Sequence, residues 1–388
     1  MNLNNTETAF KIKSSRELKT ADFLFSMIKY PRMVKILGSL SNIALKIGFP
    51  IGWAVKPTLY RHFVGGETIE ECIPAVEKLS AEKVCSILDF SVEAAKNEKD
   101  IERAYDEIMK SVINSGKHES IPFSVFKPTS LVKHEILRKV SDNDPLSDNE
   151  SIEYEKFENR FESLCIAAEK AGKPIMVDAE DYRYQKAIDD ITESMMLKYN
   201  KKRAVVYNTL QMYRRDRLDY LKNQLETARR EGIKLGIKFV RGAYMEKERA
   251  RAAEGGYPDP IFPTKQDTDN AFDEAIEIAI ENIEITDIFC GTHNEESVAK
   301  LAECMQRKGL PKGYKGIITS QLYGMSDNLT FNSAAEGYRA SKYVPYGKVK
   351  DVLPYLIRRA QENTAIAGQT SRELNMIKKE IKRRRNIR

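Results

Sequence analysis

Two arginines stand side by side near the C-terminus of the 388-residue chain, in the stretch YLIRRAQEN at residues 355–363. A helix would place four side chains of this stretch on one face, at i, i+3, i+4 and i+7. They are Tyr355, Arg358, Arg359 and Glu362. Glu362 can pair with either arginine, which leaves one positive charge for another partner. That partner is either an anion such as a carboxylate, held in bidentate fashion, or water around an exposed ion pair.

Further polar and aromatic side chains stand at the ends of short β-rich runs. They are Lys127, Asp178, Glu180, Gln211, Arg241, Tyr244, Thr292, His293, Asn294, Gln321 and Tyr343, with the cation Lys238 inside one run. In a barrel of parallel strands such ends converge on one mouth, where catalytic groups collect. Cations, directed hydrogen-bonding groups and tyrosines suit a large, polar, anionic and aromatic ligand, and a phosphate-bearing flavin fits that description.

The elements that must position these residues follow a βα repeat. The β-rich runs cover residues 121–130, 174–180, 203–211, 237–244, 287–294, 315–325 and 340–347. Longer amphipathic helical runs separate them, which predicts a parallel sheet covered by helices. Seven or eight such units in roughly 270 residues favour an α/β fold with a closed (βα)8 barrel. An open doubly wound sheet is the alternative, although no G-x-G-x-x-G or Walker A motif supports it.

The sequence before the barrel has a different hydrophobic pattern. Residues 1–115 show apolar residues at helical spacing and no alternating strand. The apolar stretch 33–55 is interrupted by lysines and a proline, which favours a buried or interfacial helix pair over a spanning helix. We therefore expect a helical segment at 1–115, a barrel at 116–370 and a basic tail at 371–388. No secretory signal is recognisable, so a cytoplasmic protein is expected, peripheral to the inner membrane if it docks there.

The net charge of +6 belongs entirely to the C-terminal tail. The last eleven residues hold seven basic and one acidic side chain, which leaves 56 of each sign in the rest. Such a tail attracts an anionic membrane surface or nucleic acid, or it is a solvated helix end. A neutral body and a tail without aromatic residues argue against nucleic acid. Five cysteines without C-x-x-C spacing and four histidines without H-x-x-x-H spacing predict neither a disulfide framework nor a metal site.

Several motifs together resemble the proline dehydrogenase family. They are FKPTSL, VDAE, VRGAYMEKER, GTHNEE, QLYGM, YVPYG and DVLPYLIRRAQEN, which occur in the family's order between about residue 120 and residue 368. Their spelling is closer to the eukaryotic-type monofunctional enzymes than to the bifunctional bacterial ones. The resemblance implies a distorted (βα)8 barrel with non-covalent FAD that oxidises L-proline to 1-pyrroline-5-carboxylate and passes electrons to a membrane quinone.

The resemblance also assigns residues. Arg358 and Arg359 would clamp the substrate carboxylate with help from Lys127, and Glu362 would brace the arginines. Tyr343 and Tyr355 would wall the proline ring, and Leu322 would cover it. FAD would contact Asp178, Ala179, Gln211, Lys238, Val240, Gly242, Ala243, Tyr244, Thr292, His293 and Asn294. The alignment favours Gln211 over Asn208 as the flavin ligand.

Two positions depart from the bifunctional bacterial pattern. Lys238 replaces an arginine near the reactive nitrogen of the flavin, and a lysine cannot fork two hydrogen bonds. Met245 replaces a tryptophan that contacts FAD. Tyr343 favours proline, because a smaller residue there goes with hydroxyproline. Hydroxyproline oxidation and a flavin-free barrel lyase or aldolase are the alternative functions. The sequence does not define the oligomeric state.

Overall fold

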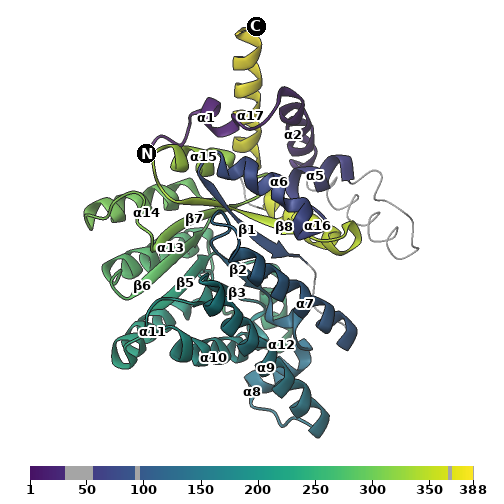
Figure 1. The fold of residues 1–388 in the computed structure, drawn as a ribbon, viewed down its shortest axis with the longest axis vertical. Helices are drawn as coiled ribbons and strands as arrows, with labels where there is room; N and C mark the ends of the chain where they lie inside the picture. The colour runs from purple at the N-terminus through teal and green to yellow at the C-terminus, as the bar shows by residue number, and fades with distance from the viewer. Residues whose placement is uncertain (31–55, 92–96, 366–368, 388) are drawn as a thin grey trace. The chain divides into compact units, whose positions relative to one another are not determined.

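Eight parallel strands form one sheet in the order β1-β8-β7-β6-β5-β4-β3-β2, with helices between them (Figure 1). The computed structural model describes residues 1–30, 56–91, 97–365 and 369–387, and among these all side chains except those of 358–370. The helix pair expected at 33–55 lies outside this part of the chain. The strand order and the intervening helices make the fold a distorted (βα)8 barrel, which confirms the expected fold class.

The strands are β1 (Val84–Phe90), β2 (Ser124–Phe126), β3 (Ile175–Val177), β4 (Val206–Gln211), β5 (Leu235–Val240), β6 (Thr286–Gly291), β7 (Ile317–Leu322) and β8 (Ala340–Tyr346). Strands β2 to β8 overlap the seven β-rich runs of the sequence. Strand β1 corrects the expectation that residues 1–115 are helical. It pairs with β8 from Val84 opposite Ala340 to Phe90 opposite Tyr346. A short apolar strand within a parallel sheet does not alternate, so periodicity does not separate it from a buried helix.

The chain divides into a central unit, residues 94–320, and a terminal unit, residues 1–93 with 321–388. These boundaries differ from the expected ones at 115 and 370. The helices of the central unit are α7 (Glu98–Ser115), η2 (Pro128–Ser130), α8 (His134–Asp142), α9 (Asp148–Ala171), α10 (Tyr182–Tyr199), α11 (Arg217–Glu231), α12 (Met245–Gly255), α13 (Lys265–Glu281) and α14 (Glu295–Arg307). Those of the terminal unit are α1 (Thr6–Phe10), α2 (Ser15–Ile28), η1 (Lys56–Tyr60), α5 (Arg61–Phe63), α6 (Ile69–Ser80), α15 (Asp327–Ala335), α16 (Val349–Ala365) and α17 (Gln369–Asn386).

Local signals fix the helix ends of the central unit. The side chain of Ser147 accepts the N–H of Glu150 while the Glu150 carboxylate accepts that of Ser147, so a capping box starts α9. The same helix stops at Gly172, whose φ of 71° suits a residue without a Cβ. At the start of α14, Asn294 accepts the N–H groups of Glu296 and Ser297. The cap at Asn294 therefore fixes where the loop after β6 ends and α14 begins.

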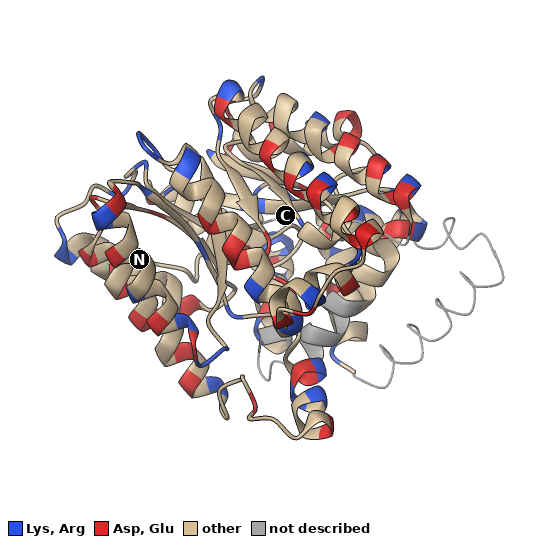
Figure 2. Cartoon of the chain, turned by 90° about the horizontal axis from the view of Figure 1, so that it is seen from below, with Lys and Arg blue, Asp and Glu red and all other residues tan. Residues whose placement is uncertain are grey.

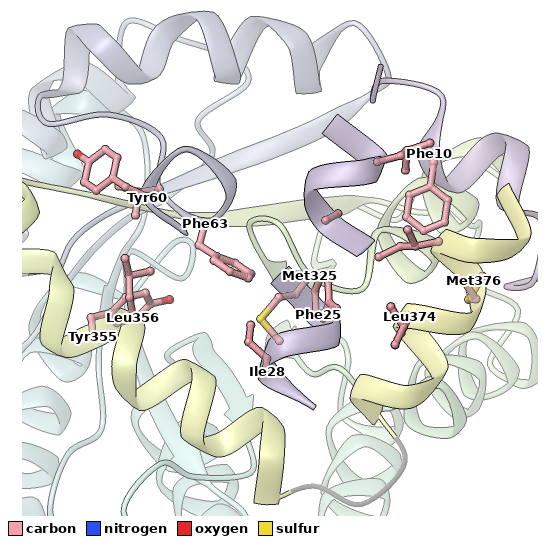
Figure 3. Packing of buried hydrophobic residues seen from close by; sticks show 14 of the residues in the cluster. Phe10, Phe25, Ile28, Tyr60, Phe63, Met325, Tyr355, Leu356, Leu374 and Met376 are labelled. Atoms are coloured by element: carbon pink, nitrogen blue, oxygen red, sulfur yellow. The ribbon is translucent and has the colours of Figure 1, made fainter. Parts of the chain in front are cut away.

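The terminal unit buries an apolar cluster made from both ends of the chain. Phe25 and Ile28 of α2 lie in it with Met325, Leu374 of α17 and Tyr355 of α16 (Figure 3). Helix α2 is amphipathic, and its inward face is closed by packing against α17. No described helix is both long and apolar enough to cross a membrane.

The expected basic tail is largely the packed helix α17. Its Glu380 is fully buried and binds Arg383 at 2.8 Å and Arg384 at 2.7 Å. Arg384 also donates to the carbonyls of Lys13 and Phe10, at 2.7 and 2.8 Å. Part of the positive charge is therefore used inside the terminal unit. Elsewhere Lys and Arg alternate with Asp and Glu along the helices, in line with the neutral composition of the body (Figure 2).

Candidate active site

Five strands of the central unit end at the same edge of the sheet, because all five run parallel. Each end carries an expected site residue: Lys127 after β2, Asp178 after β3, Gln211 in β4, Lys238 and Val240 in β5, and Thr292 after β6. Ala179, Gly242, Ala243, Tyr244, His293 and Asn294 follow in the loops of this edge. The helix α12 then begins at Met245, which is exposed.

Asp178 joins two of the predicted cations. One carboxylate oxygen lies 2.5 Å from the Lys238 Nζ, and the other lies 3.1 Å from the Lys127 Nζ. Burial opposes ionisation of Asp178, but the two ammonium groups outweigh it and hold its pKa below the usual range. The three groups carry a net charge of +1. This arrangement provides a fixed, positively charged spot at the strand ends.

Glu180 clamps the loop that carries Lys127. Its carboxylate accepts the backbone N–H of Thr129 at 2.8 Å and the Thr129 hydroxyl at 2.6 Å. Burial raises the pKa of Glu180 to about 7 against the effect of these hydrogen bonds. The Gln211 amide donates to the Glu180 carbonyl at 2.6 Å. Thr129 is therefore a positioning residue that sequence reasoning missed, although it lies inside the FKPTSL motif.

Arg241 organises the end of β6. It donates to Asp269 at 2.7 Å, to the Thr292 hydroxyl at 2.6 Å and to the Ser297 hydroxyl at 3.0 Å. Its guanidinium lies 4.5 Å from the centre of the Phe272 ring. Arg241 therefore holds the Thr292 hydroxyl in one orientation. Asp269 and Ser297 stand on helices, where no local sequence signal marks them.

Gly242 permits a close approach at the start of the RGAY loop. Its φ is 138°, and an added Cβ would lie 2.4 Å from the Tyr213 ring. The Tyr213 hydroxyl donates to the Glu248 carboxylate at 2.9 Å, and Glu248 also accepts the N–H of Tyr182 at 2.9 Å. Any side chain at 242 would displace this buried network.

Asn208 and Gln211 differ in their surroundings. The Asn208 amide donates to Asp189 at 3.1 Å and to the Tyr220 hydroxyl at 3.0 Å, and its oxygen accepts the N–H of Thr209. Asn208 thus belongs to a buried network, which also contains the Arg217–Asp189 ion pair. Gln211 instead lies at the strand end beside Glu180. Gln211 stays the predicted flavin ligand.

The terminal unit holds the residues expected to contact a substrate ring. Tyr343 lies in β8 and Tyr355 in α16, both buried. Leu322, at the end of β7, packs against the apolar cluster, and the N–H of the following Tyr323 donates to the Tyr343 carbonyl at 2.9 Å. Figure 3 shows Tyr355 beside Leu356 in this cluster.

Arg358, Arg359 and Glu362 belong to α16, and the helix continues through all three. The expected helix is therefore confirmed, and with it the spacing that places the three residues on the same face as Tyr355. Their side chains lie outside the described residues.

The central-unit edge fits a flavin by the chemistry of its donors. Two ammonium groups surround Asp178, Gln211 supplies an amide, and the positive end of the α14 dipole lies just after Asn294. Such donors bind phosphate and ring oxygens or nitrogens. Among the described residues no group of three or more His, Cys, Asp or Glu side chains could hold a metal.

The barrel and its charged strand ends define an enzyme of the (βα)8 class. A family model described as proline dehydrogenase matches residues 72–372. The chain therefore belongs to the proline dehydrogenase family, and the expected resemblance is confirmed.

Relatives are similar over most of the chain. Proline dehydrogenase 1, mitochondrial, of Dictyostelium discoideum is 32% identical, with 88% of this chain and 68% of the relative covered. A hydroxyproline dehydrogenase of Xenopus laevis is 30% identical over 97% of this chain and 88% of its own. The crystal structure of proline utilization A from Bdellovibrio bacteriovorus, inactivated by N-propargylglycine, matches with a TM-score of 0.73 at 21% identity. The match covers 93% of this chain and 38% of that one, so it shows the fold alone.

Family membership makes the chain an enzyme of proline catabolism, a flavoprotein that acts on proline.

Proposed function

We propose that the chain oxidises L-proline to 1-pyrroline-5-carboxylate with FAD held non-covalently at the strand ends of the central unit, and that a membrane quinone takes the electrons. One observation carries the assignment of the site. In a chain of this family, the Asp178 carboxylate is held by both Lys127 and Lys238 at the edge where a flavin nucleotide fits.

The proposed binding of the substrate carboxylate follows from the spacing of residues on α16. Arg358 and Arg359 hold the proline carboxylate in bidentate fashion, and Glu362 braces them. Leu322 together with Tyr343 and Tyr355 confines the ring. The protein's contribution is mainly orientation, since one C–H must face the acceptor.

The reaction removes two electrons and two protons from the ring. The substrate nitrogen loses its proton first, and its lone pair then forms the C=N bond as hydride leaves the adjacent carbon. The flavin, when bound, accepts that hydride.

Proline is favoured over hydroxyproline by Tyr343, although the relative from Xenopus laevis is named hydroxyproline dehydrogenase. We expect kcat/KM for trans-4-hydroxy-L-proline to be at least about tenfold lower, because an added hydroxyl would meet the Tyr343 ring. Steady-state assays with both substrates and an artificial acceptor measure this ratio.

The decisive test uses the purified protein. Its absorbance should show a flavin band that bleaches on addition of L-proline. Replacing both Arg358 and Arg359 by Met should lower kcat/KM by about 10³-fold or more, since two charge-assisted contacts to the carboxylate are lost. The bound flavin should remain. Undiminished kcat/KM in the double variant would contradict the proposed substrate site.

Exposed lysines of α17 supply a surface for the membrane that carries the quinone. Lys378, Lys379 and Lys382 are exposed, whereas Arg383 and Arg384 are engaged with Glu380. Each lysine near an anionic surface contributes about 1 kcal/mol. Changing the three lysines to Gln should weaken binding to phosphatidylserine vesicles by roughly 100-fold and leave binding to neutral vesicles as it was. Unaltered sedimentation with the anionic vesicles would refute this surface.

A further inference from the structure

The turn between β7 and α15 has an uncommon backbone. Gly324 has a φ of 80°, and an added Cβ would lie 2.3 Å from the His62 carbonyl oxygen. Ser326, which is not a glycine, adopts the left-handed conformation with φ 48° and ψ 44°. A conformation of this kind persists only where its surroundings hold it, and it clusters at functional sites. The turn starts at Leu322, the residue proposed to cover the substrate ring.

Lys342 holds this turn from inside the terminal unit. It is 1% exposed, and its ammonium donates to the carbonyl of Met325 at 2.5 Å and to that of Leu322 at 3.4 Å. The Asp327 carboxylate lies 2.8 Å away and supplies the third acceptor. All three ammonium protons therefore have an acceptor, and two of these acceptors are backbone groups of the turn.

Two other side chains bind the same turn. The half-buried His62 ring donates from Nε2 to the Gly324 carbonyl at 2.9 Å. The Glu373 carboxylate accepts the N–H of Ser326 through both oxygens, at 2.9 and 2.8 Å. Three carbonyls and one N–H of five consecutive residues are thus fixed by side chains from β8, α5 and α17.

The cost of burying Lys342 argues for a role beyond stability. Removing an ammonium and a carboxylate from water costs free energy, and a well-packed apolar pair is often as stable or more stable. An apolar pair would remove the ammonium donor from the carbonyls of Leu322 and Met325, although the Leu322 carbonyl would still accept the N–H of Met325 at 3.2 Å. The advantage of a lysine here is that one group ties both carbonyls to β8, one position from Tyr343.

We propose that Lys342 is a positioning residue for the substrate, which fixes the turn from Leu322 to Ser326 and so holds Leu322 at a set distance from Tyr343. The proposal rests on the proposed function, since Leu322 and Tyr343 are assigned to the substrate ring there. Lys342 protects the hydrogen bond from the Tyr323 N–H, just after β7, to the Tyr343 carbonyl in the middle of β8. Lys342 itself touches neither substrate nor cofactor in this proposal.

The test compares three variants of the full chain. Lys342→Met removes one of the two ammonium groups that pair with the buried Asp327, and it tests the Lys342–Asp327 pair. The double variant Lys342→Met with Asp327→Leu replaces the pair by apolar groups and keeps the proposal testable if the single variant does not fold. Lys13→Met is the matched control, because Lys13 binds the other oxygen of the same carboxylate, that of Asp327, at 2.7 Å.

The double variant should be destabilised less than Lys342→Met, and its KM for proline should be about tenfold higher with kcat changed less, since misplacement by about 1 Å can cost 100-fold. The dissociation constant of tetrahydrofuran-2-carboxylate, in which oxygen replaces the ring nitrogen, should rise by the same factor. Hydrogen exchange in the peptide spanning residues 322–326 should accelerate. Lys13→Met should leave all three quantities at wild-type values.

The outcomes separate the two proposals. Should the double variant keep wild-type KM, analogue binding and exchange, Lys342 is a stability residue only and the inference is wrong. A rise in KM for Lys13→Met as large as for the double variant would also overturn it. If proline fails to bleach wild-type flavin, the proposed function fails, whereas the exchange measurement still decides whether Lys342 fixes the turn.

Discussion

The two units hold their site residues in different ways. In the central unit the partners come from one continuous stretch, as in the bridge from Asp178 to Lys127 and Lys238. In the terminal unit the turn after Leu322 is bound by His62, which precedes the central unit in the sequence, and by Glu373, which follows it. The central unit thus fixes charges at strand ends with partners from one continuous segment. The terminal unit fixes a backbone turn with side chains from both of its separate segments.

The two units meet two different requirements of the proposed reaction. The proposed cofactor side needs a constant electrostatic environment, which three neighbouring charged groups provide. The proposed substrate side needs a fixed shape, and shape depends on how a loop is held. Variants in the two units should therefore affect different kinetic constants.

The largest expected effect belongs to Asp178. Changing Asp178 to Ala leaves two ammonium groups close together without the carboxylate between them. We expect kcat/KM for proline to fall about 10³-fold, or about 4 kcal/mol, with lower flavin content per chain. Steady-state kinetics and the ratio of flavin to protein absorbance measure both. The exposed Asp219 of α11, changed to Ala, is the control. A variant at 178 that retains flavin and activity would show that the bridge is only structural.

An intermediate effect concerns pH. Burial raises the pKa of Glu180 in the central unit and of Glu373 in the terminal unit to about 7, from an unfolded value near 4.5. The folded state then binds more protons between pH 4.5 and 7, so each group's contribution to stability is present below that window and is lost as pH rises through it. Each contributes up to about 3 kcal/mol.

Changing either Glu180 or Glu373 to Gln removes one of these titrations. The free energy of unfolding of each variant, relative to wild type, should therefore rise between pH 5 and pH 8. Urea unfolding at several pH values measures it. If the wild-type and variant curves run parallel, the carboxyl group in question does not titrate in this range.

The smallest effect is expected for Glu373→Ala. Loss of the Glu373 carboxylate removes the acceptor of the Ser326 N–H, just before α15, at a cost of about 1 kcal/mol. The KM for proline should rise about fivefold, because the turn loosens, while flavin content stays constant. Asn375, which is exposed on the same helix, gives a matched control when changed to Ala. A loss of flavin in Glu373→Ala as large as the loss in the Asp178→Ala variant would contradict the contrast between the two units.

Much of the central unit could be predicted from sequence. The runs ending at Lys127, Asp178 and Thr292 are short, apolar and bounded by turn residues, so both the strands and their polar ends were visible. Strand β1 was not visible, because VCSILDF lies among helical repeats and only its pairing with β8 defines it as a strand. Lys342 and Glu373 gave no signal either, since a charged residue inside a strand or helix reads as exposed until its buried partners are known. Asp269 of α13 was not predicted as a site residue for the same reason.

The discontinuity of the terminal unit has a consequence for biosynthesis. Its first part, including α2 and β1, is made about 250 residues before the partner strand β8. At translation rates of about 5–20 residues per second, that delay is roughly 10–50 s. During it the inward face of α2, with Phe25 and Ile28, has no α17 to cover it, whereas the central unit has its whole sequence available to fold. A nascent chain should therefore complete its cofactor side first, and the region around Leu322 last, with apolar surface open to chaperones in the interval.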